Sequence, residues 1–181
     1  MKTPTRLLAA VLAILLVQAA SAREVHLLTI GNSFADNACT YLDEIAESQG
    51  DTLVLTKANL GGASLKRHWE SVEAWRGNPE GDEATPYDNK GRALHGLLTA
   101  KAYDAITLQQ ASFRSYRWET YQPYASQLHA FVKEHAPRSH VYIHQTWAYR
   151  EDDTLFHGRY GLDSQQAMYE RLTENYLRMA E

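Results

Sequence analysis

The alternation of hydrophobic and polar positions divides the chain into short apolar runs separated by segments of helical periodicity. Four runs bounded by polar or turn-forming residues predict buried strands, at residues 24–30 (EVHLLTI), 52–57 (TLVLTK), 103–108 (YDAITL) and 140–145 (HVYIHQ). Apolar residues at helical spacing predict helices after the first strand up to Gly50 and at residues 65–75, 92–101, 121–136 and 164–180. Loops rich in turn residues fill positions 77–91 and 151–161.

Strands that alternate with helices predict βαβ units and therefore a parallel sheet with helices on both faces. We expect a three-layer α/β/α sandwich in which residues 24–30 form an inner strand. In such sheets, ligands bind beyond the carboxyl ends of the strands. Ser33, the pair Gly61-Gly62, the pair Gln109-Gln110 and Trp147 all follow predicted strand ends. This arrangement is the strongest functional signal in the sequence.

The first 22 residues have the pattern of a secretory signal peptide. Lys2 and Arg6 precede an apolar stretch, and Ala20-Ser21-Ala22 is a small-residue cleavage site. We therefore expect residues 23–181 to form one domain that is secreted or periplasmic, with no membrane association after signal removal. The net charge of −4 becomes −6 without the two basic residues, and no Lys/Arg run predicts nucleic-acid binding. Cys39 has no partner for a disulfide within the chain and is interpreted as a packed side chain.

Ser33 permits two interpretations. It can begin a helix as the first member of an S-x-x-D capping pair with Asp36. Alternatively, it can be a nucleophile at the edge of the sheet, with the backbone N–H groups of Ser33 and Phe34 facing an oxyanion. Further donors would come from a backbone N–H of Gly61 or Gly62 and from the side-chain amide of Gln109 or Gln110. Gly62 and Gln109 are the preferred assignments.

These segments, taken in order, resemble the first three sequence blocks of the SGNH (GDSL-like) hydrolases. The matching stretches are IGNSF, GGASL and LQQAS, and the longer set GNSF, GGASLKRHW, LQQAS, YQPY and TWAY resembles a bacterial branch described only as a domain of unknown function. The resemblance implies a flavodoxin-like α/β/α fold and serine esterase chemistry without a cofactor. Ser33 matches the nucleophile. In the third block, Gln109-Gln110 replaces the usual asparagine.

A second departure concerns the catalytic base. The family's D-x-x-H motif, which follows a fifth strand, does not occur in these 181 residues, and we expect the chain to be truncated at its C-terminus. His68, His144 and His157 are the histidines considered as substitutes, although a surface or structural role is the more common one for each. No metal site is expected, because His140 and His144 lie about 13 Å apart along one strand and His129 and His135 occupy unlike helix faces.

The aromatic residues bear on the substrate. Trp118 and Trp147 lie near strand ends, where they can either pack in the core or receive the apolar face of a sugar ring. Together with the predicted export, they favour an esterase that removes an acyl group, with acetyl the leading choice, from a carbohydrate. The alternative is a carbohydrate-binding protein without catalysis, or an inactive fragment of the esterase.

Overall fold

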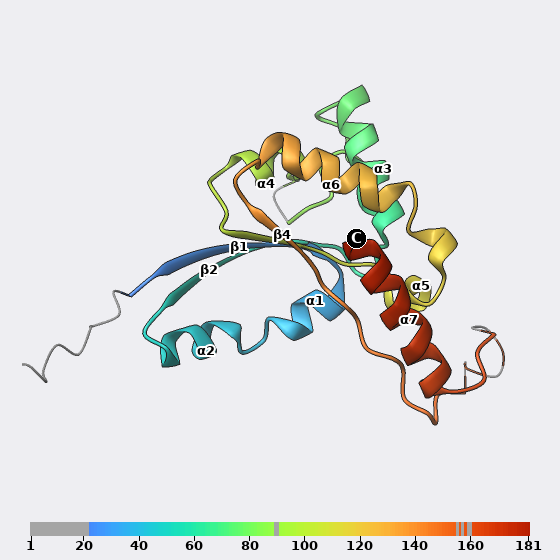
Figure 1. The fold of residues 1–181 in the computed structure, drawn as a ribbon. Coiled ribbons are helices and arrows are strands. Elements are labelled where there is room, and N and C mark those ends of the chain that lie inside the picture. Colours follow the sequence, from blue (N-terminus) through green and yellow to red (C-terminus); the bar gives the residue numbers. More distant parts are fainter. Residues whose placement is uncertain (1–21, 89–90, 155, 157, 159–160) are drawn as a thin grey trace, which may run out of the picture.

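The four predicted strands form one parallel sheet in the order β2-β1-β3-β4 (Figure 1). The computed structural model describes residues 22–88, 91–154, 156, 158 and 161–181. The strands are β1 (Glu24–Gly31), β2 (Thr52–Asn59), β3 (Ala105–Leu108) and β4 (His140–Ile143). β1 lies inside the sheet and pairs with β2 along its whole length and with β3 along its second half. The predicted inner position of the first strand is confirmed.

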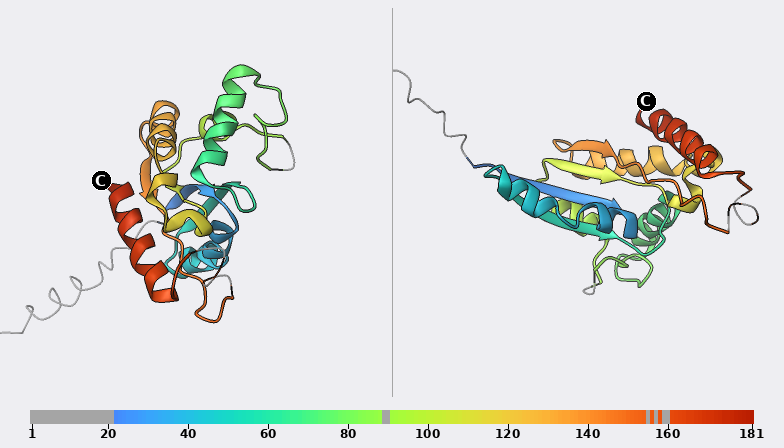
Figure 2. Two further views of the ribbon diagram at one scale, coloured as in Figure 1. Left: turned by 90° about the vertical axis from the view of Figure 1, so that its right-hand side faces the viewer. Right: turned by 90° about the horizontal axis from the view of Figure 1, so that it is seen from below.

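Helices cover both faces of the sheet, which confirms the α/β/α architecture. Their bounds are α1 (Ser33–Ala38), α2 (Leu42–Ser48), α3 (Leu65–Gly77), α4 (Leu94–Thr99), α5 (Ser112–Ser115), the 3-10 helix η1 (Trp118–Thr120), α6 (Tyr124–His135) and α7 (Gln165–Ala180). α1 and α2 lie below β1 and β2, whereas α3, α4 and α6 lie above the sheet (Figures 1 and 2). α7 contacts β4 and α5.

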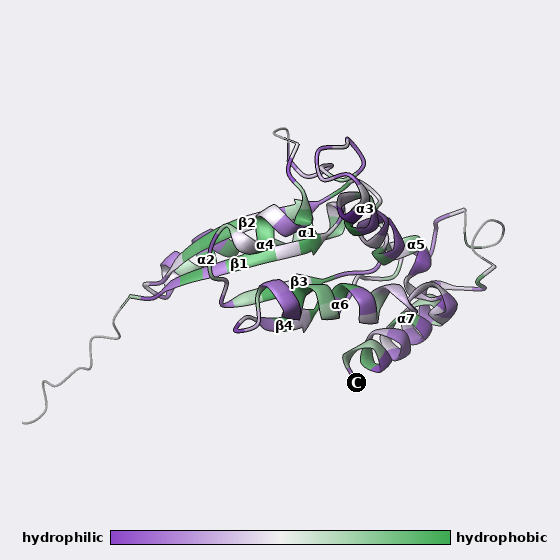
Figure 3. Cartoon of the chain, turned by 90° about the horizontal axis from the view of Figure 1, so that it is seen from above, coloured by the Kyte–Doolittle hydropathy of each residue, from purple (hydrophilic) through white to green (hydrophobic). Residues whose placement is uncertain are grey.

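The main core lies between the sheet and the upper helices. Register places Leu28 beside Ile106 and Ile30 beside Leu108, and all four side chains are fully buried. Val72 of α3 and Leu128 of α6 belong to the same cluster. In Figure 3, hydrophobic colours follow much of the strands, while hydrophilic colours mark large parts of α3 and α7. This pattern is expected for a parallel sheet that packs against amphipathic helices.

The segment after β1 differs from its predicted form. One helix from Ala38 to Gly50 is expected from the spacing of Ala38, Tyr41, Leu42, Ile45 and Ala46, but the structure has two short helices with a turn between Ala38 and Leu42. Of the expected apolar positions in the second helix, Leu42 and Ala46 are half-buried. Tyr41 and Ile45 are 68% and 57% exposed. The prediction of one continuous helix was wrong, because periodicity does not reveal a one-turn break.

Two further features lie around β3 and β4. α5 and η1, which the sequence pattern did not predict, lie in the segment that follows β3. A groove of about 570 Å³ runs beside β4, between α6 and the end of α7.

Within the described residues, no helix has both the length and the apolar character needed to cross a bilayer. The predicted signal peptide falls almost entirely on residues 1–21, which lie outside the described residues.

Candidate active site at the strand ends

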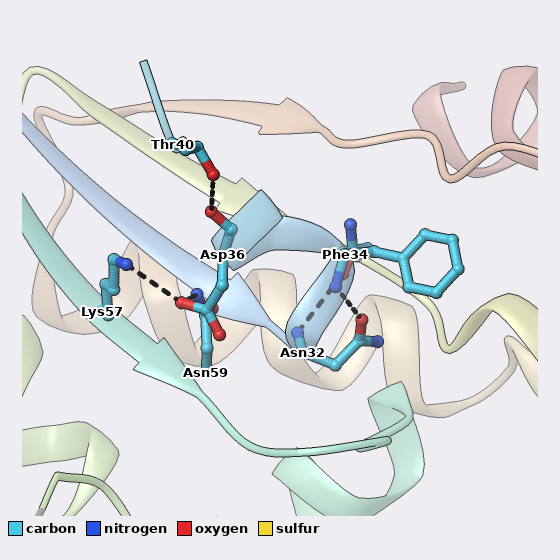
Figure 4. Close-up of polar contacts among 7 residues, drawn as sticks. Asn32, Phe34, Asp36, Thr40, Lys57 and Asn59 are labelled. Atoms are coloured by element: carbon cyan, nitrogen blue, oxygen red, sulfur yellow. Dashed lines mark hydrogen bonds and ion pairs between the residues drawn. The ribbon is translucent and has the colours of Figure 1, made fainter. Parts of the chain in front are cut away.

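The turn after β1 places Ser33 at the first position of α1. Asn32 caps the helix: its backbone is extended, with φ −144°, and its Oδ1 accepts a hydrogen bond of 3.0 Å from the Phe34 N–H (Figure 4). Asn32 Nδ2 donates to the Ala63 carbonyl at 3.0 Å. Ser33 itself is exposed, and its Oγ makes no hydrogen bond with any described residue. The hydroxyl is therefore free at the carboxyl end of the inner strand β1.

The predicted capping pair of Ser33 and Asp36 was wrong. Asp36 instead accepts a hydrogen bond of 3.0 Å from Asn59 Nδ2 and forms an ion pair of 3.1 Å with Lys57, so that it ties α1 to β2 (Figure 4). The cap at Asn32 also uses the Phe34 N–H, which was one of the expected oxyanion donors. The Ser33 N–H is left as the donor that this turn can offer.

Gly31 allows β3 to approach the turn closely. A Cβ at this position would lie 2.9 Å from Gln109 Oε1 and 3.0 Å from the Ala35 Cβ. Because glycine has no Cβ, Gln109 Oε1 can accept a hydrogen bond of 3.3 Å from the Asn32 N–H. The glycine of the GNS stretch, Gly31, thus leaves room for the side chain of Gln109, which follows another strand.

The two glutamines after β3 have different surroundings, although both are fully buried. Gln110 Oε1 accepts from the N–H groups of Leu65 and Ala111, and Gln110 Nε2 donates to the carbonyl and hydroxyl of Thr120. Its amide therefore has no free bonding capacity for an oxyanion. Gln109 Nε2 donates to His144 Nδ1 at 3.2 Å and keeps a second N–H. The preference for Gln109 over Gln110 as a donor stays a prediction, and Gln110 is the weaker candidate.

The Gly61-Gly62 turn lies next to the Ser33 turn. The two turns are joined by the bond from Asn32 to the Ala63 carbonyl. Both glycines are exposed, no atom would meet a Cβ on either within 4 Å, and Gly62 has φ +66°, a conformation that favours glycine. The proposed role of the Gly62 N–H as an oxyanion donor stays a prediction. The positive φ explains why glycine occupies position 62.

His68 is a structural residue. Its ring is fully buried: Nε2 donates to the Gly31 carbonyl at 2.9 Å, and Nδ1 accepts from the Tyr87 hydroxyl at 2.8 Å. Burial lowers the pKa of His68 to about 4, so that the ring is neutral at pH 7. Burial also raises the pKa of Tyr87, which keeps its proton for this bond. With both nitrogens engaged, His68 supports the turn and is not a base for Ser33.

His144 and His157 are the remaining histidines that could replace the missing base, and Cys39 is the residue interpreted as a packed side chain. His144 is half-buried, burial lowers its pKa, and its Nδ1 accepts the bond from Gln109. His157 lies outside the described residues. Cys39 is half-buried rather than fully packed, and burial raises the pKa of its thiol, which argues against a reactive thiolate.

The two tryptophans differ in their surroundings. Trp147 follows β4, is 46% exposed, and packs on Phe34 with ring centroids 4.3 Å apart. An open hollow of about 550 Å³ lies beside it along residues 147–154. Trp118 instead stacks on Tyr121 and lies beneath the guanidinium of Arg178, 4.0 Å from its ring centroid. Packing accounts for the position of Trp118. Trp147, in contrast, offers an exposed aromatic surface next to Phe34, the residue that follows Ser33.

Metal chemistry has no visible support in this part of the molecule. In the described ranges, no group of three or more histidine, cysteine, aspartate or glutamate side chains is arranged to hold an ion.

The sequence interpretation missed two contributors to the site, namely Asn32 as the cap and Phe34 as the partner of Trp147. An asparagine directly after a strand and before a helix is a recognisable cap signal, whereas the Phe34–Trp147 contact had no local signal.

Comparison with known proteins places this geometry in a family. The sequence profile of DUF4886, a domain of unknown function, matches residues 26–180. A crystal structure of a DUF4886 family protein from Bacteroides uniformis ATCC 8492 is 26% identical, with a TM-score of 0.70 over 87% of this chain and 63% of that one. A proposed SGNH hydrolase from Slackia heliotrinireducens is 22% identical, with a TM-score of 0.60 over 87% of this chain and 74% of that one.

The chain spans less than two thirds of the Bacteroides protein. None of the curated proteins is significantly similar to it. The family match covers nearly all residues after the predicted signal peptide, and the parallel sheet with its flanking helices is shared in outline with the SGNH hydrolase neighbour. The chain therefore belongs to the DUF4886 family and has the α/β fold of the SGNH hydrolases.

Proposed function

We propose that the protein is an exported serine ester hydrolase in which Ser33 is the nucleophile. The observation that carries this proposal is the free, exposed Ser33 hydroxyl on a turn that three separate segments support. Gln109 bonds to the Asn32 N–H, Ala63 to the Asn32 side chain, and His68 to the Gly31 carbonyl. A capping serine needs no such support, whereas a nucleophile gains from a fixed position.

The chemistry follows from this placement. Ser33 Oγ attacks the carbonyl carbon of an ester and gives up its proton, the bond from that carbon to the alcohol oxygen breaks, and the alcohol leaves with the proton. Water then cleaves the acyl-serine, which releases the acid and restores the Ser33 hydroxyl. The negative charge on the carbonyl oxygen would be stabilised by the N–H groups of Ser33 and Gly62 and by the second N–H of Gln109. His68 and His144 are committed to other hydrogen bonds, so the proposal assigns neither as the base. No cofactor takes part.

The substrate is proposed to be an acylated carbohydrate, with acetyl as the acyl group. The exposed face of Trp147 beside Phe34 supports this choice, because an aromatic surface next to the nucleophile can pack against the apolar face of a sugar. The pattern of residues 1–22 supports export, where extracellular polysaccharides are accessible.

Substitution of Ser33 tests the proposal. The protein is assayed with an aryl acetate and with an acetylated oligosaccharide, and Ser33→Ala is expected to lower kcat/KM at least about 10³-fold. Ser48→Ala is the matched control, because Ser48 is exposed on α2 and its hydroxyl bonds only within the neighbouring turn. Equal turnover by the wild type and Ser33→Ala would exclude Ser33 as the nucleophile.

A further inference from the structure

The orientation of the Gln109 amide is fixed by the backbone. The Asn32 N–H is a donor, so the group that faces it across 3.3 Å must be the oxygen of the Gln109 side chain. The amide nitrogen then lies on the other side, 3.2 Å from His144 Nδ1. No choice of side-chain flip is open, because reversing the amide would set two donors against each other at Asn32.

This orientation determines the protonation of His144. The amide nitrogen of Gln109 can only donate a hydrogen bond, so His144 Nδ1 must accept it with its lone pair. In a neutral imidazole the proton is then on Nε2. Burial lowers the pKa of His144, which agrees with a neutral ring at pH 7. The one lone pair of the ring is therefore used by Gln109, and none remains to take a proton from Ser33.

Register places the chain of contacts on the α1 side of the sheet. Gln109 follows β3 and His144 follows β4, where the N–H of His144 bonds to the Leu108 carbonyl. Thr107 and Tyr142 are register partners, so Gln109 and His144, which lie two positions later, share their face of the sheet. Gly31, which pairs with Asn59, lies on the same face. A continuous relay thus runs from β4 through the Gln109 amide to the backbone of Asn32, the residue that precedes Ser33.

We propose that His144 is a positioning residue for the nucleophile turn: held as the Nε2–H tautomer, it fixes the Gln109 amide, and Gln109 in turn holds the Asn32 N–H. Without an acceptor at the position of Nδ1, the buried amide loses one of its two anchors and the turn becomes free to shift. The step from turn geometry to turnover rests on the proposed ester hydrolase function. The step from His144 to the turn does not.

The first measurement reads the tautomer directly. Long-range ¹H–¹⁵N spectra of the histidine rings, assigned through His144→Asn, are expected to show a bare Nδ1 and a protonated Nε2 on His144 in the wild type. In Gln109→Glu, one carboxylate oxygen still accepts from the Asn32 N–H, and the other requires a proton on Nδ1. In the Gln109→Glu variant, His144 is therefore expected to carry its proton on Nδ1. A protonated Nδ1 in the wild type, or the same tautomer in a folded Gln109→Glu protein, overturns the proposal.

The second measurement separates positioning from packing. His144→Asn keeps an acceptor oxygen near the place of Nδ1, whereas His144→Leu fills similar space without one. Amide hydrogen exchange at Asn32 is expected to accelerate at least tenfold in the leucine variant and to stay near the wild-type rate in the asparagine variant. Equal exchange in the two variants contradicts the proposal, because a packing role would not distinguish them.

Turnover completes the test. The kcat for an aryl acetate is expected to fall on the order of 10- to 100-fold in His144→Leu, with recovery in His144→Asn and little change in KM. If the spectra and the exchange rates agree with the proposal but Ser33→Ala retains activity, the hydrolase proposal fails and the positioning relay stands. If Ser33→Ala is inactive but His144→Leu equals the wild type, the relay has no role in turnover and the proposal is overturned.

Discussion

At the scale of single residues, the turn that carries Ser33 depends on buried polar side chains whose hydrogen bonds are satisfied. His68 holds the Gly31 carbonyl, Asn32 caps α1, and Gln109 holds the Asn32 N–H. Each of these side chains is at most 2% exposed. An unpaired polar group at such a position costs about 1–3 kcal/mol, so loss of one partner affects both stability and the shape of the turn.

His68 gives the protein a specific dependence of stability on pH. Its pKa is about 4 in the folded protein against 6.5 in the unfolded chain, so between these pH values only the unfolded chain binds the proton. The free energy of unfolding is therefore full above pH 6.5 and falls as the pH decreases, with a total loss of about 3 kcal/mol near pH 4. Urea unfolding at pH 7, 5.5 and 4 measures this loss.

The variant His68→Gln isolates the effect, because glutamine can replace both hydrogen bonds but does not titrate. The difference between the wild type and His68→Gln is expected to shrink as the pH falls from 7 to 4. His129→Gln, at an exposed position on α6, serves as the control and should keep the wild-type pH dependence. Parallel curves for the wild type and His68→Gln would show that the ring is not buried in its neutral form.

At the scale of elements, Gln110 connects three segments that the sequence pattern does not relate. Its amide bonds the first residue of α3, the residue before α5 and the last residue of η1. The N–H of Leu65 is one of the donors that a helix start leaves without an intrahelical partner, and the glutamine oxygen satisfies it. The second of the paired glutamines is therefore a junction for the helices around the site.

Truncation of Gln110 is expected to be costly. Gln110→Ala leaves the buried Leu65 N–H without a partner and opens a cavity, which together should lower the free energy of unfolding by about 3 kcal/mol. Gln166→Ala, at an exposed position of α7 where the amide reaches only Glu170, should change it by less than about 0.5 kcal/mol. Urea unfolding of both variants is the measurement. A change below 1 kcal/mol in Gln110→Ala would contradict the junction role.

At the scale of the whole molecule, the sheet ends in two edge strands, β2 and β4. β1 is hydrogen-bonded on both sides, whereas β4 pairs with β3 on one side and, among the described residues, with no strand on the other. The N–H groups of His140 and His144 point to β3, so alternation directs those of Val141 and Ile143 toward the groove beside α6 and α7. Like the outer side of β2, this edge has no strand partner among the described residues and is open to further pairing.

Hydrogen exchange can test the difference between the edge strand β4 and the inner strand β1. The amides of Val141 and Ile143 are expected to exchange at least 100-fold faster than those of Leu28 and Ile30 in β1, since they require only local exposure. The measurement is exchange followed by NMR at a pH near 7. The amide of His144, which bonds to Leu108, is the internal control and should exchange more slowly than that of Ile143. Equal protection along β4 would mean that its edge is covered in solution.

Much of the architecture could be predicted from local patterns. The cores of β1, β2, β3 and β4 agree with their apolar runs. In β1 this follows from burial on both faces, which needs a continuous apolar stretch, whereas β4 alternates exposed and half-buried residues. Strand ends were less accurate: β1 and β2 extend to Gly31 and Asn59, while β3 begins at Ala105 and β4 ends at Ile143. The break between α1 and α2 was missed, since apolar spacing continues across it.

The sequence by itself determined that strands alternate with helices and that Ser33, Gly62 and Gln109 follow strand ends, because periodicity and turn preference are properties of neighbouring residues. Only the tertiary structure decided that His68 supports Gly31, that Gln110 is a junction and that His144 accepts from Gln109. A buried polar side chain takes the role of whichever distant group lies within hydrogen-bonding reach. That group is set by strand register and helix packing, which bring together residues far apart along the chain.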